Sequence, residues 1–203
     1  MRDIAELFEE YGLVDINKLD SGIKVDIKYA TDDNFMKKNM YGTLKKAYLI
    51  PELADRLVVV QRKLKEYDET LSLVIFDAAR PIRIQRLMYE SVKGTPQDIY
   101  VANPENNGGF HNYGMAVDLT ITSLNTGLLD MGSGFDFFGV ESHVGAEIEL
   151  LKAKKISLQA VKNRFLLYTF MIEEELFPLH NEWWHYQYHL DEKDKSKFRL
   201  LDF

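Results

Sequence analysis

Apolar residues recur at two different spacings along the chain, and the change of spacing predicts where helices and strands lie. Leu53, Leu57, Val60 and Leu64 are three or four residues apart after Pro51, a residue suited to a first helical turn. Shorter runs that alternate or are wholly apolar indicate strands. The segments with helical character are 1–12 (stopped by Gly12), 51–67, 81–93, 157–177 (with Ser157 as N-cap) and a short polar helix in 190–203. The predicted strands are 23–29, 71–76, 115–122 and 182–188.

Helices and strands are mixed without strict alternation, which indicates an α+β fold. No repeat, low-complexity tract or linker divides the 203 residues, so we expect one compact domain over 1–203. The expected architecture is a mainly antiparallel central sheet flanked by helices, with the chemistry at the sheet. Residues 30–50 are polar and long for a connection, as lids and binding loops often are.

Composition narrows the possible functions. The net charge is −7 and no dense Lys/Arg cluster occurs, so nucleic acid is not an expected partner. The chain has no cysteine, which excludes disulfides, thiolate zinc sites and a cysteine nucleophile. No apolar signal-peptide core or membrane span is seen, so we expect a cytoplasmic protein as the sequence stands, or a periplasmic one if a signal was removed. No pattern bears on the oligomeric state.

Two short segments carry candidate metal chemistry. His111 is followed seven residues later by Asp118, and Glu182 is followed three residues later by His185. A catalytic zinc site has three protein ligands, an open position for water and a nearby general base, and these four residues could supply all of the protein groups. Asp118 alone is equally compatible with pairing to a buried arginine or capping a turn.

The spacing of Glu182 and His185 poses a geometric question. On a regular strand the two side chains would point to opposite faces, so we expect Glu182 at the start of the strand or at a bulge. The alternative is a solvated Glu182 and a hydrogen-bonded core histidine. Arg80, after a predicted strand, could stabilise an oxyanion or simply pair with Asp77. We expect the remaining histidines at the surface or behind the ligands: His143, His180 and His189.

In this order, the motifs resemble those of the zinc D-alanyl-D-alanine dipeptidases, a family associated with vancomycin resistance and cell-wall peptides. The wider group of peptidoglycan peptidases shares the His-x6-Asp and Glu-x-x-His elements. The narrower resemblance extends from about Ser21 to Tyr188 and rests on further segments: Lys28-Tyr29-Ala30-Thr31 with Asn34-Phe35, Asp77-Ala78-Ala79-Arg80-Pro81, and Leu129-Asp130-Met131-Gly132-Ser133-Gly134-Phe135-Asp136 with Ser142-His143.

The resemblance implies hydrolysis of the dipeptide D-Ala-D-Ala to two D-alanines with one zinc ion per chain. It implies three zinc ligands, which are His111, Asp118 and His185. It also implies roles for four further residues: Glu182 as general base and acid, Arg80 at the tetrahedral intermediate, and Tyr29 and Asp136 near the substrate's amino end. The family usually has a serine two residues before the first zinc histidine, where this chain has Gly109, so that hydroxyl contact is lost or is replaced by a neighbour.

Three alternatives remain open at this point. The same zinc chemistry serves D,D- or L,D-carboxypeptidases that act on longer peptidoglycan stem peptides in an open groove. A zinc-bearing binding module would need neither Glu182 nor Arg80. A structural domain without metal would not require the His-x6-Asp and Glu-x-x-His elements to occur together.

Overall fold

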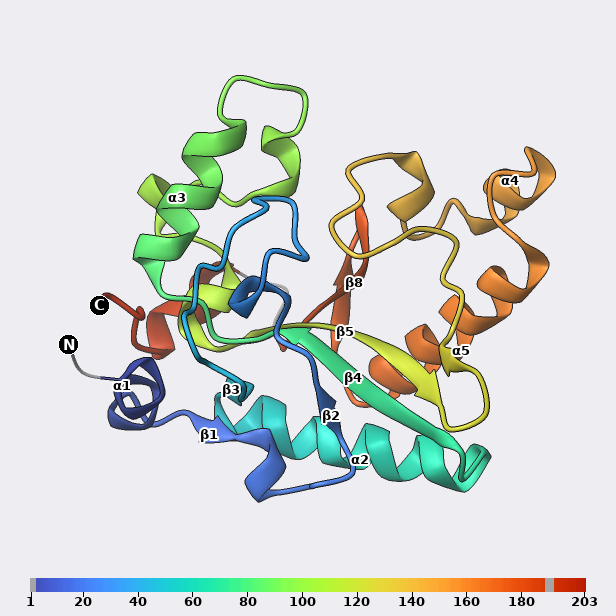
Figure 1. Ribbon diagram of the computed structural model, residues 1–203, viewed down its shortest axis with the longest axis horizontal. Helices are drawn as coiled ribbons and strands as arrows, with labels where there is room; N and C mark the ends of the chain where they lie inside the picture. The colour runs from blue at the N-terminus through green and yellow to red at the C-terminus, as the bar shows by residue number, and fades with distance from the viewer. Residues whose placement is uncertain (1–2, 189–191) are drawn as a thin grey trace.

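The centre of the molecule is a mixed sheet that brings together strands from the N-terminal, middle and C-terminal parts of the chain (Figure 1). In a computed structural model, which describes residues 3–188 and 192–203, the strand order is β2-β4-β5-β8-β7, with β6 beside β5. Among the described strands of this sheet, β2 and β4 alone run parallel, and the other neighbours are antiparallel, as expected. The strands of this sheet are β2 (Lys24–Val25), β4 (Leu71–Asp77), β5 (Ala116–Ser123), β6 (Gly127–Leu128), β7 (Phe177–Leu179) and β8 (Glu182–Gln187). A separate antiparallel pair joins β1 (Val14–Asp15) to β3 (Tyr48–Leu49).

Helices surround the sheet and confirm the α+β class. The α-helices are α1 (Ile4–Glu10), α2 (Pro51–Tyr67), α3 (Ile82–Val92), α4 (Glu147–Lys152) and α5 (Leu158–Glu173). The short 3-10 helices are η1 (Ile16–Lys18), η2 (Lys28–Ala30), η3 (Asp98–Tyr100), η4 (Pro104–Asn106), η5 (Phe110–Tyr113), η6 (Val140–Ser142) and η7 (Glu192–Lys197). Within the described residues, no helix combines the length and apolarity needed to cross a membrane.

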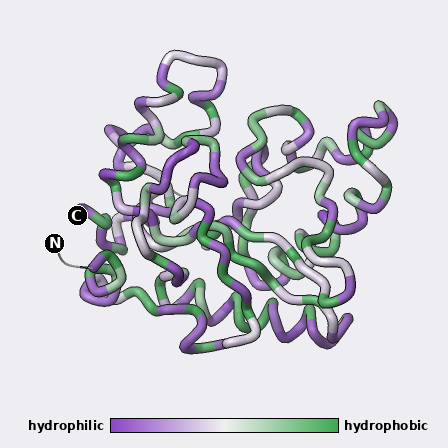
Figure 2. Tube along the Cα trace, in the orientation of Figure 1, coloured by the Kyte–Doolittle hydropathy of each residue, from purple (hydrophilic) through white to green (hydrophobic). Residues whose placement is uncertain are grey.

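The alternation of β5 explains why the sheet has an apolar side and a polar side. Val117, Leu119 and Ile121 are completely buried, and the tube in Figure 2 is coloured as hydrophobic along the central strands. Successive side chains of a strand point to opposite faces, so Asp118 and Thr120 project from the other side. Helix α2 packs on β4 and on α5, which leaves the polar side of β5 for the site.

The predicted helix at 51–67 and the strands at 71–76, 115–122 and 182–188 are confirmed to within two residues at each end. The strand predicted at 23–29 is wrong beyond Val25. There the chain turns into η2, which carries Tyr29 into the core with 2% of its surface exposed. Tertiary burial of an aromatic ring has overridden the alternation of the sequence.

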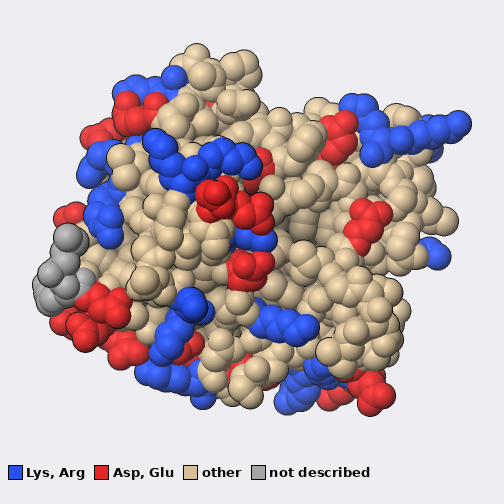
Figure 3. Space-filling model, viewed as in Figure 1, with Lys and Arg blue, Asp and Glu red and all other residues tan. Residues whose placement is uncertain are grey.

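The helix predicted at 157–177 begins as expected, because the Ser157 hydroxyl accepts a hydrogen bond from the Ala160 N–H at 2.9 Å. It ends at Glu173, and Glu175 turns the chain with φ +55° into β7. The polar tail contains the six-residue 3-10 helix η7, and His189 lies outside the described residues. On the face shown in Figure 3, cationic and anionic side chains are interspersed.

Candidate active site

Three candidate ligands from distant parts of the chain converge on one point at the sheet. His111 comes from η5, Asp118 from β5 and His185 from β8, where it pairs directly with Asp118 across the two strands. His111 Nε2 lies 3.2 Å from Asp118 Oδ1 and 3.1 Å from His185 Nδ1, which in turn lies 3.1 Å from Asp118 Oδ1. All three residues are buried.

The outer ring atoms of the two histidines determine which nitrogen faces the centre. His111 Nδ1–H donates to the Ala78 carbonyl at 2.7 Å, so its Nε2 carries a lone pair. His185 Nε2–H donates to the Gln187 side-chain oxygen at 3.2 Å, so its Nδ1 carries a lone pair. Metal-ligating histidines are typically held in this way.

These donor atoms fit a zinc ion. In a tetrahedral site with bonds of about 2.1 Å, ligand atoms lie about 3.4 Å apart, close to the three separations seen here. Three lone pairs at this distance repel one another unless a cation or a proton lies between them. Although burial alone would raise the pKa of Asp118, the adjacent His111 and His185 hold it well below its usual range, so the carboxylate is available as a ligand.

Glu182 lies beside this group without belonging to it. It is the first residue of β8, and the pairing of β7 with β8 changes register between Pro178 and Leu179, so both expectations about its position are confirmed. Its Oε2 lies 3.9 Å from His185 Nδ1. Burial, and then the charge of Asp118, raise the pKa of Glu182 to about 8. Without a metal ion this carboxyl is therefore mostly protonated at neutral pH, and its conjugate base is more basic than an ordinary carboxylate, as a general base requires.

Arg80 is held rigidly at the same pocket. Its Nε and Nη2 donate to Asp77 Oδ2 at 2.9 and 2.7 Å, and its Nη1 donates to the Gln85 side-chain oxygen at 2.9 Å. Asp77 also accepts a hydrogen bond from the Tyr41 hydroxyl at 2.9 Å. The pairing with Asp77 considered from the sequence is therefore present. Nη2 also lies 3.6 Å from Asp118 Oδ2, so the guanidinium lines the pocket beside the candidate ligands as well as pairing with Asp77.

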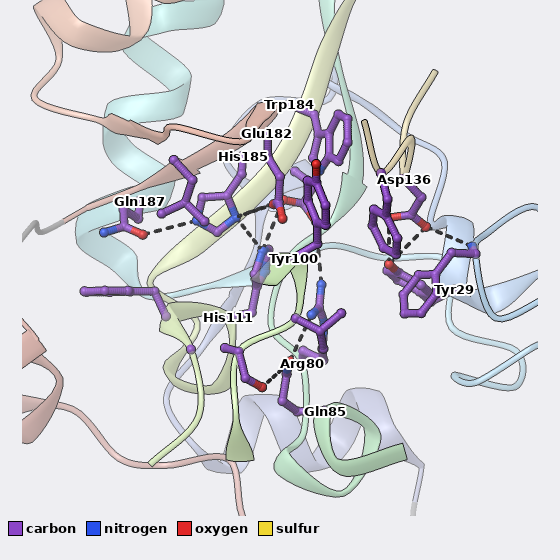
Figure 4. Close-up of a pocket in the computed structure, with 18 of the residues that line it drawn as sticks. Tyr29, Arg80, Gln85, Tyr100, His111, Asp136, Glu182, Trp184, His185 and Gln187 are labelled. Atoms are coloured by element: carbon purple, nitrogen blue, oxygen red, sulfur yellow. Dashed lines mark hydrogen bonds and ion pairs between the residues drawn. The ribbon is translucent and has the colours of Figure 1, made fainter. Parts of the chain in front are cut away.

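Tyr29 and Asp136 meet at one end of the pocket (Figure 4). The Tyr29 hydroxyl lies 3.0 and 3.1 Å from the two carboxylate oxygens of Asp136, and the Phe35 N–H donates to the same carboxylate at 3.1 Å. Burial is the main reason why the pKa of Asp136 is raised to about 7. Asp136 has φ +59°, an uncommon conformation for a residue other than glycine.

The other end of the pocket contains Gln187, a residue that the sequence analysis did not predict. In Figure 4, Gln187 and Asp136 lie on opposite sides of the two histidines. Gln187 is two residues after His185 on the same strand, a spacing that puts both on one face and could have revealed it. Gly109 also lines the pocket, and a Cβ built on it would lie 3.1 Å from the Ala102 Cβ.

His143 and His180, which are not among the three candidate ligands, lie behind or beside the pocket wall. His143 Nε2 is 3.3 Å from the hydroxyl of Tyr100, a residue that lines the pocket. The His143 ring also packs against His180, with 5.4 Å between ring centroids.

Two imidazoles and a carboxylate around one point, with a glutamate and an arginine beside them, define the class of the protein as a metallopeptidase. The chain belongs to the D-Ala-D-Ala dipeptidase family, whose sequence model matches residues 9–199.

Proteins similar to this chain agree with this assignment. The D-alanyl-D-alanine dipeptidase of Escherichia coli K12 is 30% identical over 178 residues, which cover 86% of this chain and 83% of the relative. The enzyme of the same name from Enterococcus faecium is 30% identical over 204 residues, 87% of this chain and 91% of the relative. That of Enterococcus faecalis is 28% identical over 193 residues, 88% and 92% of the two chains.

Proposed function

We propose that the protein hydrolyses the dipeptide D-Ala-D-Ala to two D-alanines, using one zinc ion bound by His111, Asp118 and His185. The observation that carries the proposal is the convergence of three lone-pair atoms 3.1–3.2 Å apart beside a buried carboxylate that is not one of them. The family and its relatives supply the substrate class. We also propose that residues 1–203 form one dipeptidase-like domain.

Glu182 and Arg80 have separate roles in the proposed reaction. A bound zinc ion would polarise the peptide carbonyl and acidify the attacking water. Glu182 takes the proton from the attacking water and later passes it to the leaving amine. Arg80 stabilises the oxyanion, and its fixed position means that it does not have to reorganise as charge develops.

The two ends of the pocket suit the two ends of a dipeptide. The Asp136 carboxylate, hydrogen-bonded by Tyr29, would pair with the substrate ammonium group. Gly109, which also lines the pocket, offers no hydroxyl, and its N–H donates to Asn112 Oδ1 at 2.8 Å. Gly109 therefore does not replace the usual serine contact with its own side chain or with that N–H.

A comparison of three substrates tests the proposal. Zinc-loaded protein should cleave D-Ala-D-Ala faster than L-Ala-D-Ala, and much faster than it releases D-alanine from a stem pentapeptide. Equal rates on the pentapeptide and the dipeptide would favour the carboxypeptidase interpretation. Zinc binding without hydrolysis of either dipeptide would favour a binding module.

A further inference from the structure

The direction of the bound dipeptide makes the surroundings of Asp136 decisive for substrate length. This inference rests on the proposed function, in which Asp136 meets the ammonium group and the metal ligands face the scissile bond. A stem peptide continues beyond that amine. Any group that fills the space there therefore limits the substrate to two residues.

Three aromatic rings from three separate segments line the pocket beside Asp136. Phe35 follows η2, Phe138 is two residues after Asp136, and Tyr100 ends η3. The Phe35 and Phe138 ring centroids are 5.0 Å apart. Phe138 and Tyr100 are stacked, with centroids 4.7 Å apart and only 9° between the ring planes. We call these three residues the aromatic cap.

The cap is attached to the framework on both sides. The backbone N–H of Phe35 donates directly to Asp136, so this ring is fixed to the residue that would bind the amine. At the other side, Tyr100 contacts His143 through its hydroxyl, and Asn181 Nδ2 donates to the carbonyl of Ile99 at 3.2 Å. Tyr100 lines the same pocket as the candidate ligands and Asp136 (Figure 4).

The cap rings are only half-buried, so they cover the pocket without forming part of the main core. Replacing one of them should open space without the large loss of stability that follows truncation of a fully buried aromatic residue. The cavity of about 390 Å³ that these rings help to enclose also contains Asp136, Glu182 and the three candidate ligands.

We propose that the aromatic cap of Phe35, Phe138 and Tyr100 sets the length specificity of the enzyme by occupying the space into which a substrate extended at its amine would continue. The stacked Phe138–Tyr100 pair is the principal barrier, because two rings from separate segments stack against each other at the pocket wall. An N-acylated substrate meets this steric barrier and also loses the charge pairing with Asp136.

The test uses N-acetyl-D-Ala-D-Ala, the smallest substrate extended at the amine, together with D-Ala-D-Ala. Zinc-loaded Tyr100→Ala and Phe138→Ala proteins should raise the ratio of kcat/KM for the acetylated substrate to that for the dipeptide by about tenfold or more, the size of discrimination that one or two clashing groups supply. Tyr100→Phe keeps the ring and removes the hydroxyl, so its ratio should stay near that of the wild type.

Ile99→Ala is the matched control, because Ile99 is in the same short helix with 68% of its surface exposed. Its ratio should not change. Zinc content and thermal unfolding identify variants that have lost their fold. If the kcat/KM ratio is unchanged in folded, zinc-loaded Tyr100→Ala and Phe138→Ala proteins, the proposal that the cap sets substrate length is wrong. It is also wrong if the wild-type protein cleaves both substrates equally well. Failure of the wild type on D-Ala-D-Ala would instead refute the proposed function.

Discussion

Glu182 connects the proposed chemistry to the stability of the metal-free protein. Burial, followed by the charge of Asp118, raises its pKa from 4.5 to about 8. In the unfolded chain the Glu182 carboxyl ionises near pH 4.5. The stability that the folded protein gains from keeping this carboxyl protonated is therefore fully present below pH 4.5 and is lost as pH rises through 8. Between pH 5 and pH 8 this loss is on the order of 3 kcal/mol, at about 1.4 kcal/mol for each pKa unit.

The substitution Glu182→Gln removes the titrating group and keeps its shape. We therefore expect the metal-free Glu182→Gln protein to gain stability relative to the wild type as pH rises, by on the order of 3 kcal/mol from pH 5 to pH 8. Urea unfolding at several pH values measures the difference. Zinc should shrink it, because a nearby divalent cation favours the ionised carboxylate.

The same substitution should remove turnover and leave the metal in place. Loss of a positioned acid–base group typically lowers kcat by about 10²–10⁴-fold, and more when it serves two proton transfers. Glu147→Gln is a suitable control, since Glu147 is also 8% exposed but lines a different cavity. A zinc-loaded Glu182→Gln protein with wild-type kcat would refute the mechanism, and a stability difference independent of pH would refute the assigned titration.

Further predictions concern the other residues of the site. His185→Ala should lose zinc on mild dialysis, measured by metal analysis. Gln187→Leu should weaken zinc binding about 10- to 100-fold in a chelator competition, and Gln187→Glu, which keeps an acceptor for His185, should bind zinc more tightly than the leucine variant. Arg80→Lys should retain zinc and lower kcat more than it raises KM, because one ammonium cannot reproduce the fixed guanidinium. Since burial raises the pKa of Asp136 to about 7, kcat/KM for the dipeptide should fall as pH drops below 7, and Asp136→Asn should raise KM and remove the part of this fall that is due to Asp136, leaving the part due to Glu182.

Local patterns predicted the parts of the fold that depend on neighbouring residues. The bounds of α2 follow from Pro51 and regular apolar spacing, and the start of α5 follows from the Ser157 cap. The end of β2 could not be predicted in this way, because Tyr29 leaves the strand to reach Asp136, which is 107 residues away.

In the candidate site, too, residue types and local spacing could be predicted from the sequence, whereas contacts between distant segments could not. The short motifs predicted three candidate ligands that do converge in space, because their residue types and spacing are restrictive. Arg80 was also identified, but the sequence could not show that it pairs with Asp77 and approaches Asp118 at the same time. Tyr100 and Phe138 had no sequence signal, since their stacking depends on two loops meeting in space.

The close approach of Gly109 to Ala102 makes the effect of one position depend on the other. Gly109→Ser restores the hydroxyl usual in the family, yet its Cβ would lie 3.1 Å from the Ala102 Cβ, tighter than most such contacts. Ala102→Gly would relieve that crowding, so the serine should be tolerated better in the double substitution than alone. Positions 102 and 109 are therefore expected to be epistatic, and homologues with a serine at the second position should covary toward a smaller or displaced residue at the first.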